Sequence, residues 1–137
     1  MSRRDAREAA FMLLYQIEIQ KGDEEAQLRS FIEEREVPES EVSYLTTLFE
    51  GVRSKKTELD ASFSPYLKRW TKERLPKIDL TILRLATYEI CFEPDVPDSV
   101  AISEAVLLAR KFSSEESRSY INAVLGRLCS DRPQPET

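Results

Sequence analysis

Three arginines lie close together at the start of this 137-residue chain, at Arg3, Arg4 and Arg7. Apolar residues then recur at three- and four-residue steps, which predicts a helix over residues 3–20. Arginines in the first turns of a helix oppose its dipole, so helix stability alone does not favour them there. Guanidinium groups bind phosphate and stack on bases. The cluster therefore indicates a site for RNA or another polyanion, and the alternative is a solvated helix end neutralised by neighbouring acids.

A second cluster mixes basic and aromatic residues. Tyr66 and Trp70 alternate with cations, and only Glu73 opposes them. The basic residues are Lys68, Arg69, Lys72, Arg74 and Lys77. Single-stranded nucleic acid is typically held by such a mixture, because cations contact phosphates and aromatic rings stack on bases. The alternative is a charged linker, and for Trp70 itself we favour a core position. A weaker third signal is the pair Arg118 and Tyr120 near the start of the last helix.

The remaining composition argues against an enzyme or a metal site. The chain has no histidine, no glycine-rich phosphate loop and no Gly-x-Ser-x-Gly motif. Its two cysteines, Cys91 and Cys129, are expected to be buried free thiols rather than zinc ligands or a redox pair. We therefore predict no catalytic residue, no metal and no cofactor. Because the net charge is −5, any nucleic-acid binding has to rest on local basic patches.

The elements that must position these clusters are predicted to be helices. Three glycines in all and few β-branched runs favour helices over sheets. About seven helices with short connections predict an all-α fold packed as two three-helix bundles. The expected division is an N-terminal bundle over about residues 1–64 and a C-terminal bundle over about residues 65–130. These bundles are too small and tightly joined to be independent, so residues 1–137 are predicted to be a single domain.

Proline, glycine and polar residues mark the expected helix ends. The predicted helices cover about 3–20, 24–35, 41–63 with Gly51 as a weak point, a short helix and turn before Pro76, 78–92, 98–111, and a last helix capped by Ser113 or Ser114. Asp98 or Ser99 is the expected cap of the preceding helix, and Asn122 is expected to satisfy a buried partner. No apolar run is long enough to cross a membrane, and polar residues interrupt any signal-peptide pattern at the N-terminus. A cytoplasmic protein is therefore expected.

Short segments along the chain also carry a family resemblance. They are Arg3-Arg4, Ala6-Arg7-Glu8, Leu14-Tyr15, Pro65-Tyr66-Leu67, Leu83-Arg84-Leu85-Ala86, Tyr88-Glu89, Val96-Pro97, Val100-Ala101-Ile102, Glu104-Ala105, Leu108-Ala109, Asn122 and Val124-Leu125. In order and spacing this set resembles the NusB family of bacterial RNA-binding factors of transcription antitermination. The resemblance covers nearly the whole chain.

The resemblance implies a transcription antitermination factor. Such a protein binds the single-stranded boxA element of ribosomal RNA leader transcripts together with NusE, a small-subunit ribosomal protein. The complex promotes readthrough by RNA polymerase, and this protein is expected to reach the RNA polymerase elongation complex only indirectly. With the basic clusters, the expected RNA-binding residues are Arg3, Arg4, Arg7, Tyr66, Arg69, Glu116, Arg118 and Tyr120. The expected contacts with NusE are Tyr15, Glu73 and Asp79.

Other interpretations stay open. Asp5 stands where many family members carry a further arginine, which weakens the expected phosphate-binding field. The helical domain also resembles the N-terminal RNA-binding module of certain ribosomal RNA cytosine methyltransferases, of which this chain would be a fragment. A protein-only adaptor that has lost RNA contact is a third interpretation. Exposed apolar faces near the basic helix are equally compatible with a homodimer that masks the RNA site.

Overall fold

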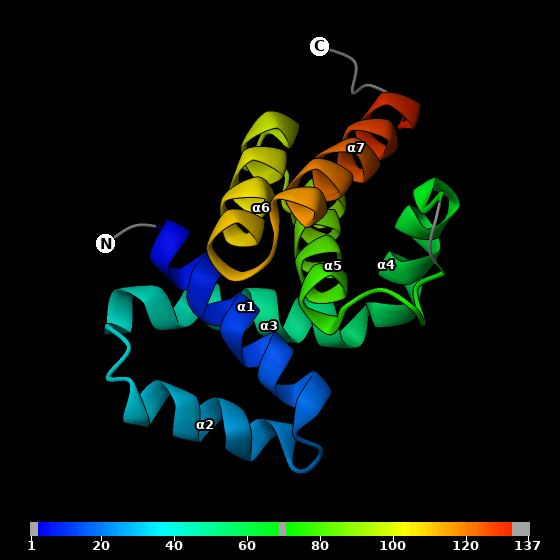
Figure 1. The fold of residues 1–137 in the computed structure, drawn as a ribbon. Coiled ribbons are helices and arrows are strands. Elements are labelled where there is room, and N and C mark those ends of the chain that lie inside the picture. Colours follow the sequence, from blue (N-terminus) through cyan, green and yellow to red (C-terminus); the bar gives the residue numbers. More distant parts are fainter. Residues whose placement is uncertain (1–2, 69–70, 133–137) are drawn as a thin grey trace. The chain divides into compact units, whose positions relative to one another are not determined.

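The computed structural model describes residues 3–68 and 71–132. Within these ranges the regular structure consists of seven α-helices and one 3₁₀ turn, with no strand (Figure 1). The predicted all-α fold class is therefore confirmed. The chain divides into two compact units, Met1–Lys55 and Lys56–Thr137. This division comes earlier than residue 64, where Pro65 suggested it.

Unit 1 contains α1 (Arg3–Ile19), α2 (Glu24–Glu34) and α3 (Glu39–Ser54). Both α2 and α3 pack against α1. Gly22 ends the connection after α1 with φ of +150°, a backbone conformation that only glycine adopts readily. The Asp23 carboxylate then caps α2 by accepting a 3.1 Å hydrogen bond from the Ala26 backbone N–H. The boundary predicted between the helices over residues 3–20 and 24–35 is therefore confirmed.

Unit 2 contains α4 (Lys56–Phe63), the 3₁₀ turn η1 (Ser64–Tyr66), α5 (Lys77–Phe92), α6 (Asp98–Phe112) and α7 (Glu115–Asp131). Helix α5 packs against α4, α6 and α7, and α6 also packs against α7. Every residue of α5 from 79 to 90 is buried. It is therefore the central helix of this unit, and the helices around it carry the exposed side chains.

Two predicted helical segments differ from the structure. The sequence suggested one long helix through Phe63 with a weak point at Gly51, but Gly51 is helical and the break falls at Lys55. The Lys55 backbone N–H closes α3 by donating to the Gly51 carbonyl at 3.1 Å. The short helix expected before Pro76 is absent from residues 71–76, where a single turn bonds Arg74 to Thr71. Pro76 limits the preceding residue to extended conformations, which explains the turn.

The polar residues of α6 and α7 match their predictions only in part. Ser114 caps α7, as expected, by accepting a 3.0 Å hydrogen bond from the Ser117 backbone N–H. The cap predicted at Asp98 or Ser99 is wrong, because α6 begins after Pro97 without a side-chain cap. Asn122 is exposed, so it does not satisfy a buried partner. Its position on α7 follows from the helix phase set by its apolar neighbours.

A buried ion pair joins α4 to α5. Arg84 donates from Nε and Nη2 to the two carboxylate oxygens of Asp60 at 2.7 and 2.8 Å. Lys72, in the connection before α5, lies 3.4 Å from the same carboxylate. The connection that follows η1 is thereby attached to the two helices that flank it. In the described part of the chain, no helix combines the length and apolarity needed to cross a bilayer.

Candidate nucleic-acid interface

The N-terminal arginines of α1 differ in exposure. Arg3 and Arg4 are exposed, whereas Arg7 is only 5% exposed. The Arg3 guanidinium also lies over the ring of Tyr44, 4.6 Å from its centroid. Arg3 and Arg7 are four residues apart and so lie on the same side of α1, but of these two only Arg3 is exposed. Arg3 and Arg4, rather than Arg7, have the exposure that contact with a phosphate requires.

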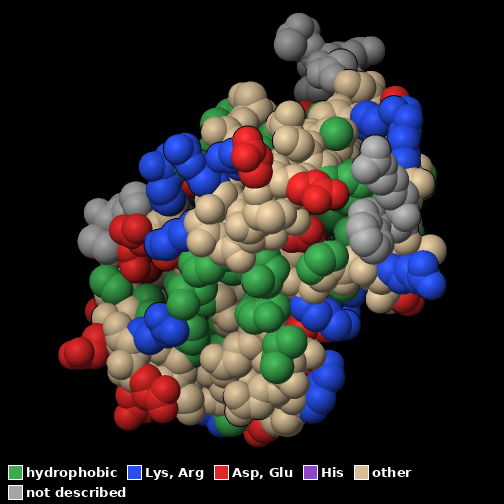
Figure 2. All heavy atoms as spheres, viewed as in Figure 1, with side chains coloured by type: hydrophobic (Ala, Val, Ile, Leu, Met, Phe, Trp, Pro, Cys, Tyr) green, Lys and Arg blue, Asp and Glu red, His purple; other side chains and the backbone are tan. Residues whose placement is uncertain are grey.

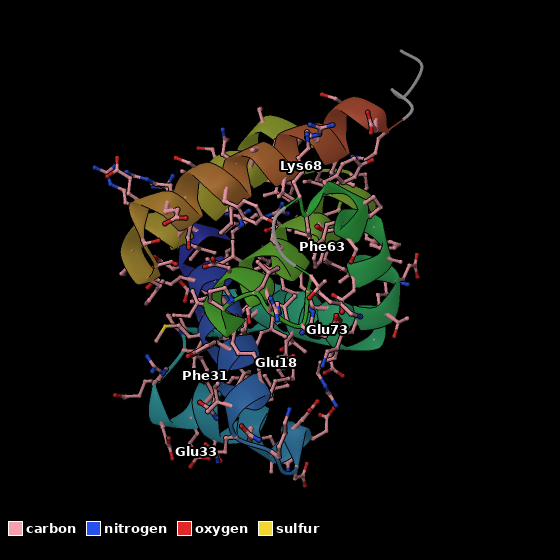
Figure 3. All side chains as sticks on the ribbon, turned by 45° about the vertical axis from the view of Figure 1, so that its right-hand side comes forward. Glu18, Phe31, Glu33, Phe63, Lys68 and Glu73 are labelled. Atoms are coloured by element: carbon pink, nitrogen blue, oxygen red, sulfur yellow. The ribbon has the colours of Figure 1, made fainter. Side chains whose placement is uncertain are left out.

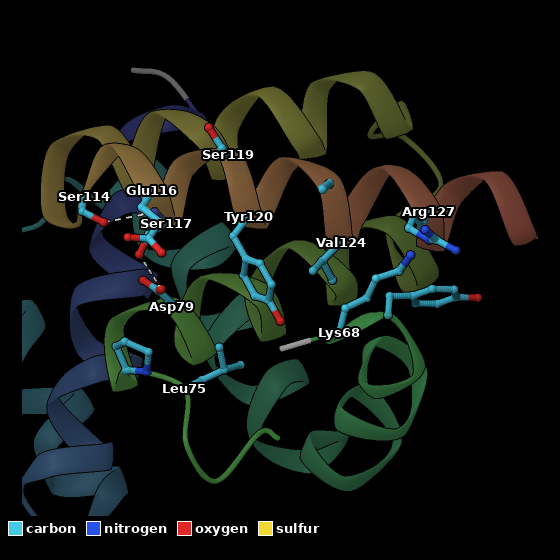
Figure 4. A pocket seen from close by; sticks show the side chains of 13 residues that line it. Lys68, Leu75, Asp79, Ser114, Glu116, Ser117, Ser119, Tyr120, Val124 and Arg127 are labelled. Carbon is cyan, nitrogen blue, oxygen red and sulfur yellow. Dashed lines mark hydrogen bonds between the residues drawn. The ribbon is translucent and has the colours of Figure 1, made fainter. Parts of the chain in front are cut away.

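A pocket of about 760 Å³ opens in unit 2 beside α7 (Figure 4). Its walls come from η1, the connection after it, the first turn of α5 and one face of α7. The lining residues are Tyr66, Lys68, Leu75, Pro76, Asp79, Ser114, Glu116, Ser117, Ser119, Tyr120, Ala123, Val124 and Arg127. The fold therefore brings Tyr66, Glu116 and Tyr120 together, three residues predicted to bind RNA that are far apart in the sequence.

Asp79 attaches the start of α7 to α5. Its buried carboxylate accepts hydrogen bonds from Ser113 Oγ at 2.8 Å and from Ser117 Oγ at 2.6 Å (Figure 4). These bonds orient the first turn of α7, from which Glu116 lines the pocket. Both oxygens of Asp79 are thus engaged within unit 2, and its predicted contact with NusE stays a prediction.

The opposite end of the pocket lies beside the last turns of α7. A hydrogen bond with Asp131, together with burial, raises the pKa of Tyr66, and the charge of Arg127 opposes this shift. Arg127 was missed by the sequence analysis, which identified Lys68 only within the charged cluster. The signal was present in the spacing, because Arg127 lies seven residues after Tyr120 and therefore on the same face of α7. Both residues line the pocket.

The other predicted residues lie outside this pocket. Arg118 is partly exposed and forms a 3.4 Å ion pair with Glu115 one turn before it. Glu73 is exposed in the connection before α5 (Figure 3). Tyr15 belongs to α1 of unit 1, where its partly exposed ring stacks on Phe11 with 6.3 Å between centroids. Arg69 and Trp70 lie outside the described residues.

On the face drawn in Figure 2, basic and acidic side chains alternate. Figure 2 shows Lys and Arg side chains in several separate groups, with Asp and Glu between them. This distribution agrees with a net charge of −5, and it restricts any polyanion to local sites. Cys91 and Cys129 are free thiols, as predicted, although both are partly exposed rather than fully buried.

Comparison with known proteins identifies the family. The model of the NusB family matches residues 4–130. The chain belongs to the NusB family. It is 43% identical over 128 residues to the transcription antitermination protein NusB of Acetivibrio thermocellus, covering 93% of this chain and 88% of that protein. The NusB protein of Ruminiclostridium cellulolyticum is 38% identical over 135 residues, covering 98% and 93% of the two chains.

Solved structures agree with this assignment. The structure of T. maritima NusB is 32% identical in sequence with a TM-score of 0.88, covering 96% of this chain and 92% of that one. The fold is also that of antitermination factor NusB in a crystal structure with NusE and double-stranded RNA, at 21% identity and a TM-score of 0.86, covering 95% and 97%. Family membership confirms the predicted resemblance and the prediction that the chain is not an enzyme. The methyltransferase alternative is not favoured, because the relatives are antitermination proteins.

Proposed function

We propose that this protein is a transcription antitermination factor that binds boxA-type single-stranded RNA of ribosomal RNA leader transcripts together with NusE. The observation that supports RNA binding most directly is the pocket of unit 2. Two tyrosines and two cations, Tyr66, Tyr120, Lys68 and Arg127, line the same cavity. Aromatic faces stack on unpaired bases and cations contact phosphates, which is how single strands are bound without a duplex.

The N-terminal arginines of unit 1 provide a second set of RNA contacts in this proposal. Arg3 and Arg4 are exposed at the start of α1 and contact backbone phosphates. Arg7, which is 5% exposed, contributes its charge rather than a direct contact. Arg69 and Arg118 add further phosphate contacts, and Glu116 accepts hydrogen bonds from bases. The two units act in this proposal as a single RNA-binding domain.

NusE is the proposed protein partner. The structure of a related NusB is described as a complex with NusE and RNA. On this chain the proposed contacts are Tyr15, Glu73 and Asp79. Ile19, which is 58% exposed, lies four residues after Tyr15 on α1 and extends its apolar face. Through NusE the protein reaches the RNA polymerase elongation complex in the cytoplasm, and self-association through apolar faces near α1 would compete with RNA.

Fluorescence anisotropy of a labelled boxA RNA, with and without NusE and at two salt concentrations, tests this function. We expect tighter binding with NusE and weaker binding at higher salt, because phosphate contacts release counterions. The variant Arg3→Glu/Arg4→Glu should lose RNA binding. The matched control Lys21→Glu/Arg29→Glu reverses two exposed cations of unit 1 and should retain it.

Two results would contradict the proposal in different ways. If the wild-type protein captures NusE but binds RNA in no condition, the protein is an adaptor between proteins. If both double variants lose RNA binding equally, the effect is one of net charge, and α1 does not contact the RNA. Affinity that falls as protein concentration rises would indicate the homodimer as the competing state.

A further inference from the structure

The pocket of unit 2 has two ends of opposite charge. Glu116 and Asp79 lie at the end formed by the first turns of α7 and α5, and Lys68 and Arg127 lie at the other (Figure 4). The helical rise separates Glu116 from Arg127 by about 16 Å along the axis of α7. A ligand with one anionic group is therefore oriented in this pocket, since its anion is attracted to one end and repelled from the other.

The cations at the basic end differ in their ion pairs from other cations of this protein, although one acid, Asp131, hydrogen-bonds with Tyr66 at the same end. Arg84 pairs with Asp60 and Arg132 with Asp98. Within residues 3–68 and 71–132, by contrast, neither Lys68 nor Arg127 forms an ion pair or donates a hydrogen bond to a side chain. Figure 4 shows the Lys68 side chain extending toward the guanidinium of Arg127. Two cations that approach each other in this way repel, and an anion placed between them removes the repulsion.

We propose that Lys68 and Arg127 together hold one backbone phosphate of the bound single strand, an inference that rests on the RNA-binding function proposed above. A guanidinium contacts phosphate with two parallel hydrogen bonds, and an ammonium adds a point charge beside it. The volume of about 760 Å³ lies within the usual range for sites that enclose part of a ligand. Tyr120, which lies between the two ends, and Tyr66, which lies at the basic end, provide the stacking surface for the neighbouring base.

The acidic end then reads the base that follows along the strand. Asp79 already accepts hydrogen bonds from Ser113 and Ser117, so the exposed carboxylate of Glu116 is the acceptor that remains. A carboxylate accepts from the exocyclic amino groups of adenine, cytosine or guanine, whereas uracil presents no such group. The polarity of the pocket therefore fixes the direction in which the strand lies along α7.

A salt series with the NusE complex and a single-stranded boxA RNA tests the phosphate site. Each phosphate contact on a single strand contributes about 0.7 to the slope of log K against log salt concentration. The variant Lys68→Ala/Arg127→Ala should therefore bind more weakly at low salt, with a slope shallower by about 0.7. The charge-conserving exchange Lys68→Arg/Arg127→Lys should keep the wild-type slope. The control Lys21→Ala/Arg29→Ala removes the same charge elsewhere and should also keep it.

The outcomes separate this inference from the function on which it rests. If Lys68→Ala/Arg127→Ala keeps the wild-type slope while Arg3→Glu/Arg4→Glu loses binding, the phosphate site is wrong and RNA binding stands. If the alanine control loses as much slope, the effect is non-specific and the site is again wrong. If wild-type protein with NusE binds no RNA, both proposals fail. All substituted side chains are exposed, and matching thermal transitions confirm that each variant is folded.

Discussion

Replacing Arg84 by methionine would leave the Asp60 carboxylate in the interior of unit 2 without its principal partner. The side chains of Arg84 and Asp60 are 9% and 4% exposed, and two hydrogen bonds of 2.7 and 2.8 Å join them. The remaining cation, Lys72, lies 3.4 Å away and its side chain is 42% exposed. Lys72 is therefore screened by water, and it replaces only a small part of the lost interaction.

The expected magnitudes differ several-fold between the two cations of Asp60. Breaking one side of a buried ion pair costs about 3–5 kcal/mol, because the other charge stays buried and uncompensated. An exposed pair contributes about 0.2–1 kcal/mol, so Lys72→Ala should cost no more than that. For a chain of this length 1 kcal/mol corresponds to about 4 °C in Tm. Arg84→Met should therefore lower Tm by about 12–20 °C, and Lys72→Ala by at most about 4 °C.

Urea unfolding followed by circular dichroism measures these differences as changes in the free energy of unfolding. The double variant Asp60→Ala/Arg84→Met removes both charges, so it should be more stable than Arg84→Met alone. Two results would refute the reasoning. The first is an Arg84→Met variant within about 1 kcal/mol of wild type, which would place the pair in effective contact with water. The second is a double variant less stable than the single one, which would make packing rather than charge the dominant contribution.

Two further predictions concern thiol chemistry and buried hydroxyls. Burial and, after it, the charge of Asp98 raise the pKa of Cys129 to about 11. In a Cys91→Ser variant, the reaction of Cys129 with maleimide should therefore be slow at pH 8 and should accelerate toward pH 11. Asp98→Asn should lower the pKa of Cys129 and increase the reaction rate at pH 8. The buried Thr87 Oγ1 has no hydrogen-bond partner in the described structure, so Thr87→Val should stabilise by about 1 kcal/mol. Thr81 Oγ1 donates to the Lys77 carbonyl at 2.7 Å, so Thr81→Val should not stabilise, and equal urea midpoints for both valine variants would contradict this.

Helix ends were predictable where one residue carries the local signal. Gly22 has a backbone conformation that favours glycine, and Ser114 accepts a hydrogen bond from the backbone N–H of Ser117, the third residue of its helix. The break at Lys55 had no such signal, because lysine is a good helix former, whereas the poor helix former Gly51 lies four residues earlier. Packing of α3 and α4 in their separate units, rather than propensity, decides where that helix ends.

The candidate site also contains residues that were predicted from the sequence and one that was not. Tyr66 and Tyr120 were named from their basic and aromatic clusters and from the family resemblance, Glu116 from the resemblance alone, and the structure places all three in one pocket. Arg127 was missed because its neighbours in sequence form no motif, although it shares a helix face with Tyr120. Arg7 shows that spacing does not predict exposure. Its type and spacing match those of Arg3, yet it is 5% exposed, and exposure is not a property of spacing.

Residue types and periodicity alone were sufficient to predict an all-α chain without enzyme motifs, because helix-forming patterns and the absence of histidine are local properties of the sequence. The family was also recognisable, since it depends on the order of short segments. Only the tertiary structure decided which charges are paired, which arginine is buried, and that Lys68 and Arg127 share the end of one pocket. These depend on the packing of helices within each unit, which no local pattern encodes.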